Sequence, residues 1–516
     1  MFLRFTVFIT GAVVMIVELL GTKIIAPFFG STVYTWTALI AVTMVSLSAG
    51  YYLGGHVSDK LLSKDRLYWI ILFSAVFLLV IPFLQFPVLK LGSKFGLRSG
   101  VLISSFILFS VPLLLLGMVS PFSVKLCYQD KARLGKTVGS LYAISTVGSL
   151  VGTILTGFFF IPHFGNLHIL LGCSVTLILL SAFFFLAASG GKDRTIRGGI
   201  IVFLLVFAWI VGRYSHQNSV FVKDKFIYKV IDRANSNYGN LRIVDIAYAE
   251  SPDAPFQRDL YNDGLCQNRI DLRTGKSLVP FSYALKGLIA LTNPAPKTLL
   301  CIGTGAGILP MEFFEMGVEV DAVEINPQIH TMAKKYFNYS DSKAHTIEAD
   351  GRYYLNSTEK KYDVVILDAF LGDSVPAHLL TIEMFRTIKS HLNQDGVLVV
   401  NFFGIRKNDM AVDALYTMLK KTFTHVNAYS KSEVKLTNIY FSASDKEPAS
   451  RFVFSEGPPP FLAKILKDIF SHPLEMFYDE TLILTDNKNP VEIWDLKNRE
   501  EVRKRIQSFF LMDILA

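Results

Sequence analysis

Charge and cysteine are both scarce in this chain of 516 residues. Charged side chains make up 18% of it, against about 25% in typical soluble domains. The four cysteines, none of them in a CxxC pair, are Cys127, Cys173, Cys266 and Cys301. This scatter argues against both a disulfide framework and a zinc site, so we expect no metal.

The scarcity of charge belongs to one part of the chain. Residues 1–213 hold 16 basic and 5 acidic side chains, so about 10% are charged and the net charge is +11. Residues 214–516 hold 35 basic and 38 acidic side chains, so about 24% are charged and the net charge is −3. The part that resembles a soluble domain is slightly acidic, which argues against nucleic acid as a partner.

Long apolar runs fill the first part. Most of them reach the ~20 residues that a membrane-spanning helix needs. The seven runs are 5–28, 33–54, 67–88, 101–119, 138–161, 166–188 and 198–212. We therefore expect residues 1–213 to form a multi-pass α-helical domain in the lipid bilayer of the cell (inner) membrane.

Two polar features interrupt this apolar part. Glu18 lies inside the first run, where an ionisable group is either functional or paired, here with Lys23 about a turn and a half further along. The stretch 54–60 (GGHVSDK) resembles the Gly-x-x-x-Asp-Arg/Lys loop of major-facilitator transporters, although a basic turn after a glycine-rich helix end has the same composition. Transport is therefore one function that these features leave open.

From about residue 224 the pattern changes to short strands. Phe226–Ile231, Leu241–Ala247 and Arg258–Tyr261 predict a small β-region, and we assign residues 214–290 to a linker and this region. From Thr298 strands alternate with helices, which predicts a parallel sheet with helices on both faces within residues 291–516. The expected strands are Thr298–Ile302, Val318–Glu324, Ala344–Glu348, Tyr362–Leu367 and Gly396–Asn401. Ligands of such sheets bind at the carboxyl ends of the strands.

Three glycines, Gly303, Gly305 and Gly307, follow the first of these strands. The dinucleotide fingerprint G-x-G-x-x-G fails, because Ile308 stands where its third glycine belongs. A loop without Cβ atoms still lets the backbone approach a ligand closely. The loop therefore predicts a ligand other than a dinucleotide.

Acidic residues end the next two strands. Glu324 comes 21 residues after Gly303, where an acid can bind both hydroxyls of a ribose; its structural alternative is capping the helix at Asn326-Pro327. Asp350-Gly351 follows the third strand, where a carboxylate and a backbone N–H can bind an adenine edge. Together these features indicate an adenosine without pyrophosphate, as in S-adenosylmethionine-dependent transferase folds of the Rossmann-like kind.

Asp368 closes the fourth strand. A carboxylate at this place can accept a proton from an attacking amine and hold a cationic substrate, and its structural alternative is a helix N-cap. The polar loop Leu371–Leu380 that follows is long enough to act as a lid.

The motifs of the second part resemble the spermidine synthase (polyamine aminopropyltransferase) family, and the whole chain resembles its membrane-fused branch. The resemblance covers most of residues 235–492 in the family's order. Its stretches are Tyr238–Val244, Asp263–Gln267, the glycine loop, Val323–Pro327, Asp350–Arg352, Leu367–Phe370, Pro376–Thr381, Leu484–Asn487 and Asn489–Glu492. Three stretches near the N-terminus resemble the membrane extension of that branch: Met15–Glu18, Ala26–Gly30 and Tyr34–Thr37.

The resemblance implies transfer of an aminopropyl group from decarboxylated S-adenosylmethionine, a cosubstrate rather than a bound cofactor, to putrescine. The products are spermidine and methylthioadenosine, and Asp368 is the proton acceptor. The residues implied for the donor are Gly239, Gln267, Gly303, Gly305, Gly307, Glu324, Asp350, Gly351 and Pro376. Those implied for the amine are Asp368, Ala369, Phe370, Leu371, Ser282 and Ala306. A homodimer is the assembly that the family suggests.

Three positions depart from the family pattern. Soluble members have Asp where this chain has Ala306, Gln where it has Gly239, and His where it has Ser282. Because these departures affect the amine half of the site, another amine acceptor and methyl transfer from S-adenosylmethionine are alternatives. A transporter with a polyamine-sensing domain is a third.

Basic residues divide unequally between the predicted membrane loops. The N-terminus and the even-numbered loops carry 11, and the odd-numbered loops carry four. The positive-inside rule thus places the N-terminus in the cytoplasm. Seven spans would then export the catalytic part, whereas its cosubstrate is cytoplasmic, so we expect a cytoplasmic catalytic domain and the sequence leaves the topology open.

Overall fold

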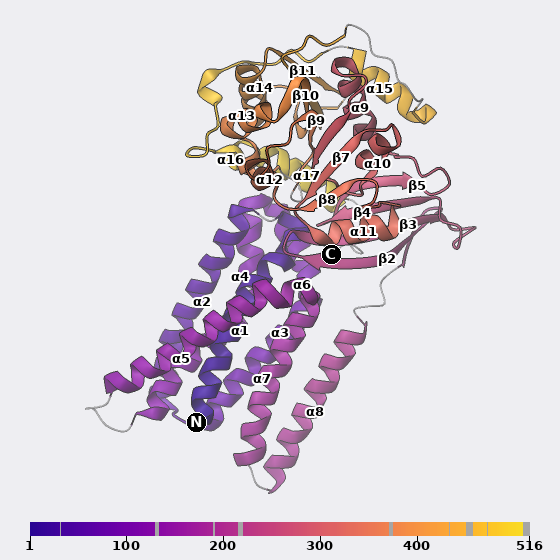
Figure 1. Cartoon of the computed structure of the whole chain (residues 1–516). Helices are drawn as coiled ribbons and strands as arrows, with labels where there is room; N and C mark the ends of the chain where they lie inside the picture. The colour runs from indigo at the N-terminus through magenta and orange to yellow at the C-terminus, as the bar shows by residue number, and fades with distance from the viewer. Residues whose placement is uncertain are drawn as a thin grey trace. The chain divides into compact units, whose positions relative to one another are not determined.

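The computed structural model describes residues 1–30, 32–128, 134–188, 191–214, 220–370, 375–432, 434–449, 458–471 and 473–508 (Figure 1). These residues form two compact units. The first contains the described residues of Met1–Ser219 together with Ala234–Asn240, and the second contains those of Val220–Arg233 and Leu241–Phe509.

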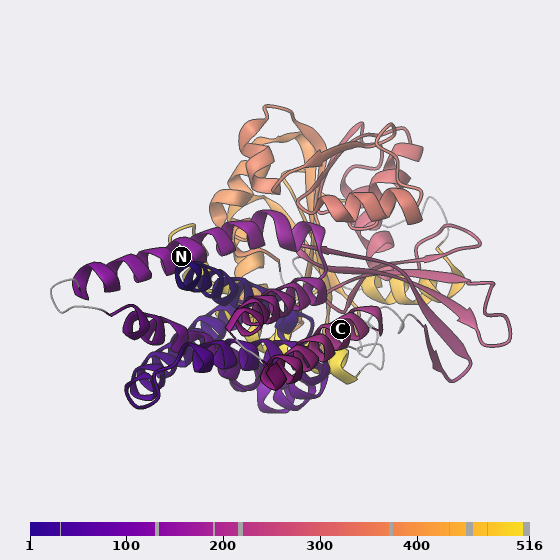
Figure 2. The same ribbon diagram turned by 90° about the horizontal axis from the view of Figure 1, so that it is seen from below.

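The first unit is helical, and each of the seven apolar runs lies in its helices. They are α1 (Phe2–Phe29), α2 (Val33–Lys60), α3 (Lys64–Gly92), α4 (Gly96–Cys127), α5 (Leu134–Leu155), α7 (Asn166–Ala188) and α8 (Gly191–Tyr214). A 3₁₀ turn, η1 (Ser93–Phe95), joins α3 to α4, and a π-helical turn, η3 (Thr156–Phe160), joins α5 to α6 (Ile161–His163). Figure 2 shows most of these helices nearly end-on, side by side in a bundle.

Six helical stretches of the described residues are long and apolar enough to cross a membrane, and the longest, Lys64–Cys127, contains both α3 and α4. Glycines set how closely the helices pack. A Cβ at Gly50 of α2 would collide with the carbonyl oxygen of Leu114 on α4, and one at Gly148 of α5 would collide with that of Phe8 on α1. Such contacts between backbones are what holds helices together in lipid.

The two ionisable residues of α1 do not pair with each other. Lys23 Nζ donates to the carbonyl oxygen of Asn237, 2.6 Å away, within the first unit. Among the described residues, Glu18 has neither a hydrogen bond nor an ion pair. The pairing alternative for Glu18 is therefore wrong.

A five-stranded antiparallel sheet lies mostly in the second unit, apart from its residues within Ala234–Asn240. Its strands, in sheet order, are β1 (Val220–Lys223), β2 (Phe226–Ser236), β3 (Gly239–Tyr248), β4 (Gln257–Asn262) and β5 (Leu265–Asp271). The sequence predicted β2, β3 and β4. It missed β1, which is four residues long, and β5, whose alternation of apolar and polar residues is broken by Gln267-Asn268.

The second sheet has seven strands in the order β11-β12-β10-β9-β6-β7-β8. These are β6 (Thr298–Ile302), β7 (Glu319–Glu324), β8 (His345–Glu348), β9 (Tyr362–Leu367), β10 (Leu392–Ile405), β11 (His425–Ser430) and β12 (Leu436–Ser444). The strands from β6 to β10 are parallel, as predicted. The sheet also has an antiparallel edge that the sequence did not predict, because β12 lies antiparallel to both β10 and β11.

Helices cover both faces of this sheet, which confirms the predicted α/β class. One face packs on α9 (Pro280–Thr292), α10 (Ile308–Glu315), α11 (Pro327–Tyr336) and α15 (Pro460–Ser471). The other packs on α12 (Gly351–Ser357), α13 (Ile382–Ser390), α14 (Met410–Thr422) and α16 (Val491–Trp494). Leu299 and Cys301 point to the first face, and Leu300 and Ile302 to the second, because successive side chains of a strand alternate. The remaining elements are η4 (Ala377–Leu379), η5 (Glu480–Leu482) and α17 (Leu496–Ser508).

Candidate active site

The centre of the seven-stranded sheet is the point where its strand order reverses. From β6 the chain proceeds to β7 on one side, whereas β9 leads to β10 on the other. Asp368 N–H donates to the carbonyl of Ile302 at 2.9 Å, so the loops after β6 and β9 leave the sheet side by side. Open α/β sheets bind their ligands at such a switch point.

The loop after β6 has all three predicted glycines in left-handed backbone conformations. Their φ angles are 85° for Gly303, 51° for Gly305 and 76° for Gly307. A Cβ at Gly303 would collide with the Asp368 carbonyl oxygen. Glycine is therefore required here both by conformation and by the close approach of the two loops.

Asn268 of β5 holds the middle of this loop, and sequence reasoning did not single it out. Its Oδ1 accepts a hydrogen bond from Ala306 N–H at 2.7 Å, and a Cβ at Gly305 would collide with the same oxygen. Asn268 and Ala306 are both buried. In the sequence, the only sign that Asn268 belongs to the site is its position next to Gln267.

Glu324 ends β7 and joins the glycine loop to that strand. Its Oε2 accepts from Thr304 N–H at 3.1 Å, and its Oε1 accepts from Asn326 N–H at 3.0 Å. Burial raises the pKa of Glu324, although hydrogen bonds from backbone N–H groups oppose the shift. The helix-capping alternative is wrong, since Asn326 caps α11 by accepting from Gln328 N–H.

Asp350 caps α12 at the end of β8. Its Oδ1 accepts from Arg352 N–H and Tyr353 N–H, each at 3.0 Å, and its Oδ2 lies 2.7 Å from His378 Nε2. The hydrogen bond with His378 is the main reason that the pKa of Asp350 is lowered. His378, in η4, is a second residue that sequence reasoning missed.

Asp368 follows β9 and is partly exposed. Its Oδ1 accepts from Asn401 Nδ2 of β10 at 2.8 Å. Burial raises its pKa to about 7, and the nearby negative charge of Glu324 adds to the shift, while the Asn401 hydrogen bond opposes it. Among the described residues the next helical turn begins only at Ala377, so Asp368 does not cap a helix there. A carboxylate with a pKa near neutrality is suited to take up and release a proton.

Comparison with known proteins identifies this region. Residues 281–443 match the family described as the spermine/spermidine synthase domain. The C-terminal region contains a spermine/spermidine synthase domain. Ser282, the glycine loop, Glu324, Asp350 and Asp368 all fall within the matched residues of this domain.

Several individual relatives are named polyamine aminopropyltransferases. The polyamine aminopropyltransferase of Vibrio vulnificus is 38% identical over 136 residues, which are 25% of this chain and 45% of that protein. The one from Neisseria meningitidis serogroup A is 26% identical over 175 residues, 33% of this chain and 66% of that protein. The chain thus spans less than two thirds of the length of these relatives. The solved spermidine synthase of Thermotoga maritima aligns with a TM-score of 0.38 and 20% identity, over 48% of this chain and 87% of that one.

The structure describes some of the other predicted site residues but not all of them. Ala369 and Phe370 follow Asp368 and are half-buried, as are Pro376, which precedes η4, and Gln267 of β5. Leu371 and the loop residues up to 374 lie outside the described residues. Gly239 belongs to the first unit, so it is not placed with the others.

The side chain of Ser282 makes a structural hydrogen bond within the fold. It is buried in α9, and its hydroxyl accepts from Ser277 Oγ at 3.2 Å. Within the described part of the chain, no group of three or more His, Cys, Asp or Glu side chains is arranged to hold a metal ion.

Proposed function

We propose that this chain is a membrane-anchored polyamine aminopropyltransferase that makes spermidine and methylthioadenosine from putrescine and decarboxylated S-adenosylmethionine. The proposal depends chiefly on Asp368, a carboxylate with a pKa of about 7 beside a glycine loop at the switch point of the sheet. The polyamine aminopropyltransferases among the relatives support the same reaction class.

The reaction needs alignment and one proton acceptor. The amine nitrogen attacks the methylene carbon bound to the sulfonium sulfur, and the carbon–sulfur bond breaks with its electron pair leaving on sulfur. The product ammonium gives one proton to ionised Asp368. Because the sulfonium is already an activated leaving group, positioning and proton transfer supply the catalysis.

We assign the donor's nucleoside to the side of the site formed by β6, β7 and β8. Glu324 would accept hydrogen bonds from the ribose hydroxyls, as an acid at the end of the second strand of such a sheet can. Asp350 and Gly351 would contact adenine, Pro376 would border the base, and the three loop glycines would leave room for the sulfonium chain.

We assign the amine to the side of Asp368, with Ala369 and Phe370, which follow it in the chain; the family resemblance adds Leu371. This half of the site departs from the pattern of the soluble family members. Ala306 contributes a backbone N–H that already bonds Asn268, and Ser282 bonds Ser277, so neither supplies the charged contact of the soluble family. We infer that Gln267 contacts the aminopropyl group and that Asp368 is the main anion for the amine, with Gly239 in the place of the family's glutamine.

We also propose that the apolar helices of residues 1–213 anchor the enzyme in the cell membrane with the catalytic domain in the cytoplasm, where the cosubstrate is made. Residues 214–290 would then be the linker and small β-domain, and residues 291–516 the catalytic domain. Protease accessibility in intact vesicles of known orientation tests the topology. Cleavage of the C-terminal domain from the outer side of right-side-out vesicles would contradict it.

A product assay tests the reaction. Purified chain in detergent is supplied with either decarboxylated S-adenosylmethionine or S-adenosylmethionine, each with several amines, and methylthioadenosine and S-adenosylhomocysteine are quantified. We expect methylthioadenosine and spermidine with the decarboxylated donor and putrescine. S-adenosylhomocysteine from the second donor would instead support a methyltransferase, the candidate that Ala306 favours, because no carboxylate there selects for a donor without a carboxyl group.

A further inference from the structure

Two asparagine side chains form a chain of hydrogen bonds that ends at Asp368. Asn438 Nδ2 of β12 donates to Asn401 Oδ1 of β10 at 2.8 Å, and Asn401 Nδ2 donates to Asp368 Oδ1 at 2.8 Å. Asn401 is 2% exposed, so its amide is out of reach of bulk water. The contacts link three adjacent strands of the central sheet, of which β9 and β10 are labelled in Figure 1.

The chemistry of the groups fixes which way the amides point. An ionised carboxylate only accepts hydrogen bonds, so Asn401 must present its NH₂ group to Asp368. Its oxygen is then left facing β12, where only a donor satisfies it, and Asn438 supplies one. Strand register brings the two together as diagonal neighbours, since Asn401 lies opposite Tyr440 and Asn438 lies opposite Phe403.

The two oxygens of Asp368 have different surroundings. Oδ1 is held by Asn401, whereas Oδ2 has no hydrogen-bond partner within the part of the chain that the structure describes. Fixing one oxygen fixes the plane of the carboxylate and therefore the direction of the other. The oxygen with no partner among the described residues is the one available to an incoming amine.

We propose that Asn438 and Asn401 are positioning residues that hold Oδ1 of Asp368 and thereby direct its Oδ2 toward the amine that attacks the donor. This inference rests on the proposed function, because it assigns a role in that reaction. Neither asparagine touches the reacting atoms in the proposal. Asn401 acts through Asp368, and Asn438 acts through Asn401 by preventing its amide from turning over.

The positioning role has a measurable signature beyond a loss of rate. A hydrogen bond donated to a carboxylate favours its charged form. Removing the donor therefore raises the pH at which Asp368 loses its proton, and it also lets the carboxylate rotate. A residue needed only for packing would change stability without moving this pH.

The test uses the full chain in detergent and three matched variants. Asn401→Leu removes both hydrogen bonds at nearly constant volume, and Asn438→Leu removes only the outer one. Asn427→Leu makes the same change on β11, where the side chain is half-buried like that of Asn438. Thermal unfolding of each variant checks that it folds, and Asn438→Leu serves if Asn401→Leu does not.

Rates are measured as kcat/KM for the donor across pH, at saturating amine. For Asn401→Leu we expect the acidic limb to move up by about one pH unit, as the loss of one charge-assisted hydrogen bond predicts, with KM for the donor unchanged. Asn438→Leu should shift it in the same direction by less, and Asn427→Leu should leave it in place. A wild-type pH profile in folded Asn401→Leu would overturn the inference.

A second readout separates this inference from the proposed function. The carboxyl band of Asp368, obtained as the infrared difference between wild type and Asp368→Asn, is titrated in wild type and in Asn401→Leu. If the wild type forms no methylthioadenosine, the proposed function fails, and this titration still decides whether the asparagine pair acts on Asp368. An identical midpoint in both proteins would overturn the pair's role even if the enzyme is active.

Discussion

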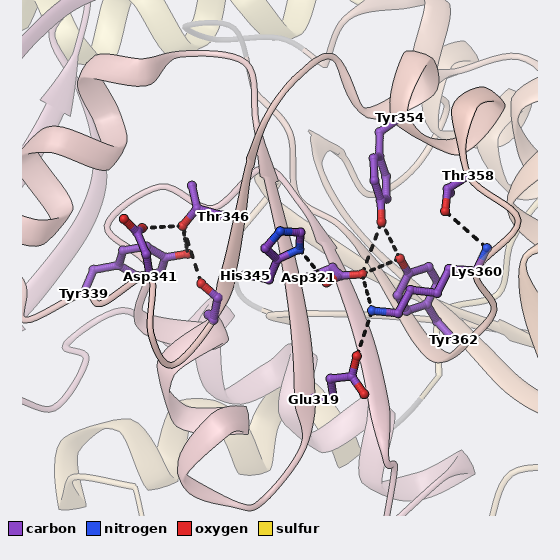
Figure 3. A network of polar contacts seen from close by, with 11 residues as sticks. Glu319, Asp321, Tyr339, Asp341, His345, Thr346, Tyr354, Thr358, Lys360 and Tyr362 are labelled. Atoms are coloured by element: carbon purple, nitrogen blue, oxygen red, sulfur yellow. Dashed lines mark hydrogen bonds and ion pairs between the residues drawn. The ribbon is translucent and has the colours of Figure 1, made fainter.

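The two ends of the parallel strands carry buried or partly buried aspartates whose pKa values are shifted in opposite directions. Asp321 lies near the amino end of the strands, is 2% exposed and is surrounded by donors, as Figure 3 shows. Its Oδ2 accepts from Lys360 Nζ at 2.8 Å and Tyr362 Oη at 2.6 Å, and its Oδ1 lies 3.2 Å from His345 Nδ1. Asp368, at the carboxyl end, has one donor among the residues that the structure describes.

The number of donors decides in which direction the pKa of each carboxylate shifts. Burial by itself raises the pKa of both groups, but the hydrogen bonds from Lys360 and Tyr362 outweigh it at Asp321, whose pKa is lowered. At Asp368 a single amide does not outweigh burial, and the pKa is raised to about 7. The sheet thus has a structural aspartate at one end and, at the other, the aspartate that we propose as the proton acceptor.

Asp368→Asn should have the largest effect. Loss of a general base predicts a fall in kcat of about 10³-fold, measured as methylthioadenosine formed. Stability should change the other way: the raised pKa means that the folded state resists ionisation, so stability is lost as pH rises from about 4 to about 7. The amide avoids that loss, and we expect a gain of about 1–3 kcal/mol at pH 8 in thermal unfolding. Nearly full activity in the variant would refute the assignment of the base.

The pH dependence of the wild type is the second prediction. Since Asp368 must be ionised to accept the proton, kcat/KM for the donor at saturating amine should fall about tenfold per unit below a bend near pH 7. An acidic limb that bends at pH 4 to 5 would mean that an unperturbed carboxyl titrates instead. Asp321→Asn is the control, and its bend should stay where the wild type has it.

Asp321→Asn should reverse the pattern of Asp368→Asn. It removes a buried charge that has several donors, which predicts a loss of about 2–3 kcal/mol of unfolding free energy with less than about threefold change in kcat. Because the pKa of Asp321 is lowered, its contribution is present at neutral pH and lost as pH falls through that lowered value. Wild-type and variant stabilities should therefore converge in acid. A large loss of kcat in folded protein would show that the two ends of the sheet are coupled.

Much of the fold could be predicted because its signals are local. The run Tyr362–Leu367 and the glycines after Ile302 identify a strand and a tight loop without knowledge of contacts. The apolar runs of residues 1–213 identify helices by length alone. The antiparallel edge formed by β11 and β12 was missed, because whether a strand pairs parallel or antiparallel depends on which distant strand it meets.

The partners of the site residues could not be predicted for the same reason. Asp368 was found because it ends a strand, but its donor Asn401 is 33 residues away, and Asn438 is a further 37. Asn268 reaches the glycine loop from another sheet. Single polar residues inside apolar strands, as in the run Val399–Phe403, are the one local sign of such contacts, because burial of an unsatisfied amide is costly.

Tyr354→Phe should give the smallest effect and tests whether the donors at Asp321 act singly. Tyr354 Oη donates to Asp321 Oδ2 at a longer distance, 3.2 Å, and lies 2.7 Å from Tyr362 Oη. Asp321 keeps its shorter contacts with Lys360 and Tyr362 when this hydroxyl is removed, so we expect a loss of about 0.5–1 kcal/mol and unchanged kcat. Tyr353→Phe, on the neighbouring residue of α12 with a side chain that is 68% exposed, is the control and should change neither. A loss for Tyr354→Phe as large as that for Asp321→Asn would mean that the donors form one cooperative network, in which no single contact is dispensable.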